Sequence, residues 1–89
     1  MKYKLTEETK AWCGRTLHRI EAVESFGDVK AGEKGGWVEK EENLSQEGLC
    51  WVFGDAWVYG NAQVYGNAWV YGDAQVYGNA WVFGDAQVY

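Results

Sequence analysis

The stretch that decides the fold is residues 51–89, WVFGDA WVYGNA QVYGNA WVYGDA QVYGNA WVFGDA QVY, in which one six-residue unit recurs to the last residue. Valine holds the second position of every unit, and in each complete unit glycine holds the fourth and alanine the sixth. A period of six with an aliphatic residue and a small residue four places later is typical of a left-handed parallel β-helix. An α-helix is excluded, because six does not match its 3.6-residue period and each unit carries a glycine.

Each six-residue unit is predicted to form a short strand followed by a corner. Ala-Trp-Val-Tyr alternates inward and outward side chains, as a pleated strand does. Glycine followed by Asn or Asp then turns the chain, since these residues tolerate positive φ. Three units make a triangular coil of about eighteen residues, and the coils stack at the ~4.8 Å spacing of strands. The interior of the predicted solenoid therefore receives only valine and alanine.

The same register continues only in part towards the amino terminus. Counting back in sixes from Ala56 gives Cys50, Leu44 and Val38, which are all apolar. Counting back from Val52 gives polar residues instead. We therefore expect residues 32–50 to form a degenerate first coil, so that the solenoid has about three coils. Cys50 is then a small buried hydrophobe in an alanine position.

Residues 1–31 lack the repeat and read as a β-hairpin cap. Residues 3–5 and 16–23 are predicted strands, with a turn around Cys13 and Gly14. A cap of this kind hides the strand edge at the lower end of the solenoid. The sequence thus predicts one all-β structural domain in three parts: cap 1–31, degenerate coil 32–50 and regular solenoid 51–89.

Composition narrows the function classes. The 89 residues carry a net charge of −5, and 47% of them are hydrophobic, too many for a disordered acidic tail. No apolar run reaches the length of a membrane helix or resembles a signal peptide, so we expect a cytoplasmic location. All eight basic residues precede position 41, which argues against direct nucleic-acid binding.

The repeat contains few residues that could serve in catalysis or bind a metal. The one histidine, His18, lies in the predicted cap, and the three acidic residues after position 50 occupy turn positions that Asn also fills. Two cysteines make neither a disulfide framework nor a metal site. We therefore expect no enzymatic activity, no cofactor and no metal.

The outward aromatic residues are the candidate binding surface. An eighteen-residue coil stacks them in the columns Phe53–Tyr71–Tyr89, Tyr59–Tyr77, Tyr65–Phe83, Trp51–Trp69–Gln87, Trp57–Gln75 and Gln63–Trp81. Such columns stabilise neighbouring coils, and exposed Trp and Tyr are also enriched at binding hot spots. The candidate partner-binding residues are Trp51, Trp57, Tyr59, Tyr65, Trp69, Tyr71, Tyr77 and Trp81.

Self-association is the first partner considered. The last coil leaves an open strand edge and the end of a Val/Ala core at Val82, Phe83, Val88 and Tyr89. Two chains could stack end to end there, or pair their aromatic faces, and either arrangement would cover a costly edge. We therefore expect a homodimer.

The upstream part of the chain also resembles a known family. The resemblance lies in residues 19–23 (RIEAV), 26–32 (FGDVKAG), 35–38 (GGWV), 43–48 (NLSQEG) and 50–52 (CWV). Together with the hexapeptides, these stretches resemble the YdcK-type β-solenoid family. The resemblance implies a bacterial, phage or prophage protein of undefined biochemical role, whose larger relatives are sometimes labelled hexapeptide transferases by fold analogy.

The sequence thus predicts a non-catalytic, self-assembling protein–protein interaction module that binds through its Trp and Tyr columns. The alternative is a small phage-encoded inhibitor of a host defence complex, of the anti-CRISPR type. It would act in the host cytoplasm by steric block or by acidic mimicry. The remaining alternatives are a hexapeptide acyltransferase-like enzyme and a carbohydrate-binding module.

Overall fold

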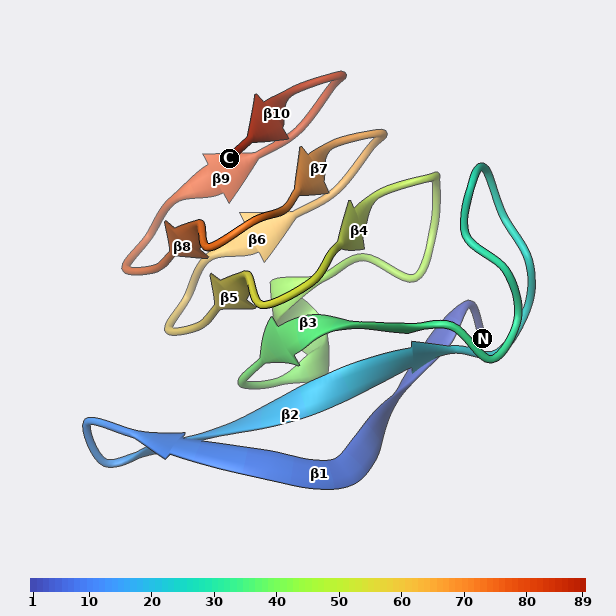
Figure 1. Cartoon of the computed structure of the whole chain (residues 1–89). Helices are drawn as coiled ribbons and strands as arrows, with labels where there is room; N and C mark the ends of the chain where they lie inside the picture. The colour runs from blue at the N-terminus through green and yellow to red at the C-terminus, as the bar shows by residue number, and fades with distance from the viewer.

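The computed structural model describes all 89 residues. Three stacked coils with short parallel strands make up most of the molecule (Figure 1). The first coil contains β3 (Lys34–Val38), the 3₁₀ helix η1 (Glu41–Asn43) and β4 (Trp51–Val52). The second contains β5 (Trp57–Val58), β6 (Gln63–Val64) and β7 (Trp69–Val70). The third contains β8 (Gln75–Val76), β9 (Trp81–Val82) and β10 (Gln87–Val88). The predicted all-β parallel solenoid is confirmed, and no helix in it is long and apolar enough to cross a membrane.

The stacked strands give the solenoid three faces, which we name by what covers or marks them. The hairpin face consists of β3, β5 and β8, to which two antiparallel strands are added. The hollow face consists of β4, β7 and β10. The η1 face consists of β6 and β9, and an isolated parallel bridge between Leu44 and Val64 continues it into the first coil.

The interior is filled as the repeat predicts. Val58, Val64 and Val70 are almost completely buried, and the small alanines before each strand fill the space beside them. At the corners the glycines have positive φ, for example 70° at Gly66. A Cβ on Gly66 would lie 3.0 Å from the backbone nitrogen of Gly84 in the next coil. Glycine is therefore required there both for the turn and for the close stacking of coils.

The first coil is irregular at one corner, and this corrects part of our predicted register. Val38 pairs with Val58 and Leu44 with Val64, twenty positions later, whereas Val52 pairs with Val70, eighteen positions later. The corner at 45–50 thus holds two extra residues, and both Leu49 N–H and Cys50 N–H donate to the Gly66 carbonyl. Val38 and Leu44 consequently occupy valine positions, not the alanine positions we expected.

Cys50 does lie where we predicted it. It precedes Trp51 as Ala68 precedes Trp69 in the coil above, and it is fully buried. Cys50 is the last residue of the irregular corner, so a register counted back from Ala56 reaches it before crossing the two extra residues. The prediction fails beyond this point because the repeat contains no signal for the insertion.

At the short helix η1, hydrogen bonds of the Asn43 side chain take the place of backbone pairing between the first and second coils. Its side-chain oxygen accepts hydrogen bonds from the backbone N–H groups of Glu39 and Lys40. Its amide donates to the carbonyls of Gly60 and Ala62 in the second coil. A fully buried polar side chain is stable when each of its groups is paired in this way.

The amino-terminal third is an antiparallel hairpin of β1 (Tyr3–Trp12) and β2 (Arg15–Ala22). Cys13 and Gly14 both have positive φ, which identifies a two-residue hairpin turn at the predicted place. The first strand is longer than the predicted residues 3–5 and bends at a register shift between Leu5 and Thr9. Because β2 pairs with β3, the hairpin extends the hairpin face and covers its lower edge (Figure 1).

Lys2 and Tyr3 close the lower end of the first coil. The Tyr3 hydroxyl donates to the carbonyls of Glu41 and Leu44. The Gln46 side-chain oxygen accepts a hydrogen bond from the Tyr3 backbone N–H, and the Gln46 amide group donates one to the Tyr3 carbonyl. The Lys2 ammonium donates to the carbonyl of Cys50 at 2.8 Å and lies 3.3 Å from its sulfur. Burial of this ammonium lowers the pKa of Lys2 from its ordinary value.

Candidate interaction surface

The outward columns stack as the eighteen-residue spacing predicts. Tyr59 and Tyr77 are parallel at 5.3 Å between ring centres, and Tyr65 and Phe83 are parallel at 5.4 Å. The strand register also places Trp69 between Trp51 and Gln87. Because the six columns are distributed over the three faces, two to each face, the structure does not gather the eight candidate residues into one site.

The two lower coils of the hairpin face are partly covered by a segment of the same chain. The Lys10 ammonium lies 4.6 Å from the ring centre of Trp37 and 5.0 Å from that of Trp57. Trp12 packs edge-on against Trp57 at 5.1 Å. Arg15 lies 5.7 Å from the Tyr59 ring and bonds Glu39. Trp57 and Tyr59 are therefore only half-exposed and mainly hold the hairpin in place.

Trp51 corrects our list of outward binding residues. It is 0% exposed, because Tyr3 and Phe26 pack edge-on against it at 6.1 and 5.3 Å. The chain before β3 thus covers the hollow face at its lowest strand. Trp51 is part of the hydrophobic core, whereas Trp69 one coil above is half-exposed.

Above Trp51 the hollow face carries an open aromatic depression of about 240 Å³. Its lining, which we call the aromatic hollow, is Asp28, Phe53, Trp69 and Tyr71. Phe53 is nearly perpendicular to both other rings, at 71° to Trp69 and 76° to Tyr71. The Trp69 indole is held by a 3.1 Å hydrogen bond from its Nε1 to the Leu49 carbonyl. Three aromatic rings and one acidic residue therefore line this depression.

The upper side of the aromatic hollow is held by a small polar network. The hydroxyls of Tyr71 and Tyr89 both donate to the Gln87 side-chain oxygen at 2.8 Å. The rings of Tyr71 and Tyr89 lie 4.3 Å apart. The adjacent Tyr89 side chain raises the pKa of Tyr71 to about 12, above its ordinary value of about 10.

The remaining predicted residues lie on the third coil. Trp81 and Tyr77 are 64% and 58% exposed, and Phe83 and Tyr89 are exposed as well. Val82 is buried and Val88 is half-buried at the upper end of the core. Each of β8, β9 and β10 is an outer strand of its sheet, so one backbone edge of each is unpaired within these 89 residues.

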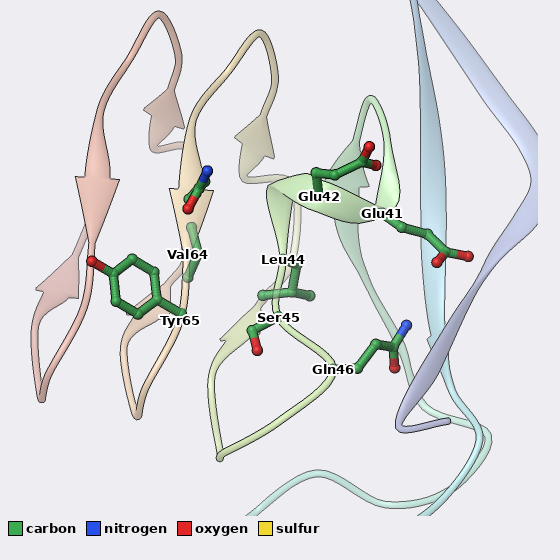
Figure 2. Close-up of a pocket in the computed structure, with 8 residues that line it drawn as sticks. Glu41, Glu42, Leu44, Ser45, Gln46, Val64 and Tyr65 are labelled. Carbon is green, nitrogen blue, oxygen red and sulfur yellow. The ribbon is translucent and has the colours of Figure 1, made fainter.

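A second depression lies on the η1 face and was not predicted from the sequence. It has a volume of about 450 Å³, and Figure 2 shows its lining around the irregular first coil. Glu41 and Glu42 extend from η1 in different directions, while Ser45 and Tyr65 lie below them (Figure 2). The structure contains no group of three or more His, Cys, Asp or Glu side chains that could hold a metal. The site has no repeat signature, because it forms only where η1 interrupts the strands.

Comparison with known proteins connects the fold to a family. Residues 62–74 and 74–89 match the model of the YdcK β-solenoid repeat. The chain is also 38% identical over 77 residues to a protein of Escherichia coli (strain K12) named "Uncharacterized acetyltransferase YdcK". This match covers 70% of the chain but only 24% of that relative.

The relative also corrects one prediction. Its name points to an enzyme, and this overturns our expectation that the chain is not one. The resemblance read from the sequence is confirmed by the repeat match and by the relative together. The chain thus carries the β-solenoid repeat of the YdcK-type family.

Proposed function

We propose that the chain is a protein-interaction module whose hollow face binds a partner protein. The observation that carries this proposal is the aromatic hollow: Trp69 lies on β7, Phe53 and Tyr71 directly follow β4 and β7, and the hairpin makes no aromatic or cation contact with these rings. Aromatic side chains fixed in a depression are the usual anchors of protein interfaces. On the hairpin face, the corresponding aromatic residues already bind a segment of the same chain.

Capture from lysates of candidate host cells, with mass spectrometry, tests this proposal. We expect Trp69→Ala to lose most of the captured partner, since loss of an anchoring Trp costs about 2 kcal/mol or more. Trp81→Ala is the matched control, because it removes the same side chain from the η1 face. Equal capture by both variants and the unchanged chain would contradict a site on the hollow face.

Self-association is a second arrangement of the same module. The unpaired edges of β8, β9 and β10 and the exposed Phe83 and Tyr89 support it, because a second copy placed on them would complete backbone pairing. Light scattering of the 89-residue chain should then give twice the 10.1 kDa mass. A single 10.1 kDa species at millimolar concentration would exclude the homodimer.

Inhibition of a phage host's defence complex is one biological setting for such a module. Steric block through the hollow face fits this role better than acidic mimicry. Residues 51–89 carry only three carboxylates, and one of these, Asp55, lies 3.8 Å from Arg19. Replacement of Asp55, Asp73 and Asp85 by Asn should therefore leave capture of the partner unchanged. Acidic mimicry instead predicts that this triple substitution abolishes capture.

Acyl transfer is the second candidate function, and the name of the relative supports it. Incubation of the chain with acetyl-CoA and a panel of amines, followed by free-thiol measurement, tests it directly. Thiol release above that of a heat-unfolded sample would favour acyl transfer by these 89 residues. Equal release would place any such activity outside them.

A further inference from the structure

The aromatic hollow has the composition of a site for a cation. Its lining consists of three aromatic residues, whose ring faces carry partial negative charge, and one acidic residue, Asp28. Asp28 is exposed and makes no ion pair or side-chain hydrogen bond in this chain. A carboxylate beside aromatic rings attracts an ammonium or guanidinium group by two independent electrostatic effects.

The hairpin face of the same molecule shows what such columns bind. There the aligned Trp37 and Trp57 hold the Lys10 ammonium at 4.6 and 5.0 Å from their ring centres. A guanidinium, that of Arg15, lies over Tyr59 in the next column. Both strands of the amino-terminal hairpin thus place cations on the Trp and Tyr rings of this solenoid, Lys10 from β1 and Arg15 from β2.

The hollow face has the corresponding residues without the cation. None of the five cation–π contacts in the chain involves Phe53, Trp69 or Tyr71. Residues 51–89 contain no lysine or arginine, so the coils above the hollow cannot supply one. Their three carboxylates instead make this part of the surface negative.

We propose that the aromatic hollow binds a lysine or arginine side chain from a basic segment of a partner protein. The cation lies against Trp69 and Tyr71 and faces Asp28, and its aliphatic stem packs on Phe53. The volume of about 240 Å³ accommodates the end of one such side chain. This inference rests on the proposed function, because it specifies the chemistry of the partner that the hollow face recognises.

Titration calorimetry with short peptides tests the inference without knowledge of the partner. The probes are acetyl-Gly-Lys-Gly-amide and acetyl-Gly-Arg-Gly-amide, with norleucine and citrulline peptides as uncharged controls. We expect each charged peptide to bind about fivefold or more tightly than its control, as for a cation between aromatic rings. Binding should weaken as salt is raised, since Asp28 is exposed.

Two variants assign the effect to the hollow. Asp28→Asn should weaken the charged peptides about threefold, whereas Asp73→Asn removes the same charge outside the hollow and should change nothing. Equal binding of norleucine and lysine peptides, or tighter binding of methyl glucoside than of either charged peptide, would overturn the inference. An equal effect of the two Asp variants would also overturn it.

The capture experiment separates this inference from the proposed function. If Asp28→Asn retains the captured partner while Trp69→Ala loses it, the hollow face binds a protein but not through a cation. If charged peptides bind and no protein is captured with the unchanged chain, the cation site stands and the proposed function fails.

Discussion

The hairpin face and the hollow face are built from the same six-residue unit but differ in what lies on them. On the hairpin face, Trp37 and Trp57 are covered by Lys10 and Trp12. On the hollow face, Trp51 is covered by Tyr3 and Phe26, but Trp69 one coil above, which is half-exposed as Trp57 is, has no cation on its ring. The difference shows that the repeat provides aromatic columns and that the chain before it decides which of them remain available.

The largest expected effect comes from Trp37→Ala on the hairpin face. Trp37 is buried beneath the cations of Lys10 and Arg19, so its loss should reduce the free energy of unfolding by about 3–5 kcal/mol. Urea unfolding followed by circular dichroism measures this change. A loss below 1 kcal/mol would show that the hairpin does not depend on its aromatic contacts.

Trp69→Ala on the hollow face should cost less stability, about 1–2 kcal/mol, because its ring is half-exposed. The same urea experiment compares it directly with Trp37→Ala. Trp81→Ala, at an exposed position of the η1 face, should change the free energy of unfolding by less than about 0.5 kcal/mol. If Trp69→Ala destabilised as much as Trp37→Ala, the hollow would be part of the core.

Removal of one cation from the hairpin face sharpens the comparison further. Lys10→Met keeps the length of the side chain but loses the charge above Trp37 and Trp57, and should cost about 1 kcal/mol. Lys4→Met, on the same strand and exposed, is the matched control. Thermal unfolding at low salt measures both variants, and similar melting temperatures would argue against cation–π stabilisation.

The smallest expected effect concerns the hydroxyl of Tyr71 on the hollow face. Because the adjacent Tyr89 side chain raises the pKa of Tyr71 to about 12, Tyr89→Phe should bring the pKa of Tyr71 back towards the ordinary value of about 10. The raised folded-state pKa means that this contribution to stability is present below pH ~10 and is lost as the pH rises through about 12. Absorbance at the tyrosinate band against pH measures the shift; identical titrations of both proteins would refute it.

The regular coils and their columns could be predicted because each unit repeats the same inward and outward positions. The corner at 45–50 could not, since its two extra residues change the register without any repeat signal. Trp51 and Trp81 are both followed by Val and Phe, yet one is 0% and the other 64% exposed. Trp51 is buried because Tyr3 and Phe26, which are distant from it in sequence, pack against its ring.

The aromatic hollow could be predicted only in part. The stacking of Phe53 and Tyr71 follows from their spacing of eighteen residues. Asp28 belongs to the loop between β2 and β3, and no periodicity relates it to these rings. Self-association, cytoplasmic location and phage origin stay predictions from the sequence.

The most direct test of the difference between the two faces is the ¹H–¹⁵N spectrum of the six indole groups during titration with acetyl-Gly-Lys-Gly-amide. We predict that the Trp69 indole resonance shifts in a saturable manner, while those of Trp37 and Trp57 stay in place because Lys10 already occupies them. Saturable shifts of Trp57 without any shift of Trp69, or no saturable shift at all, would contradict the account.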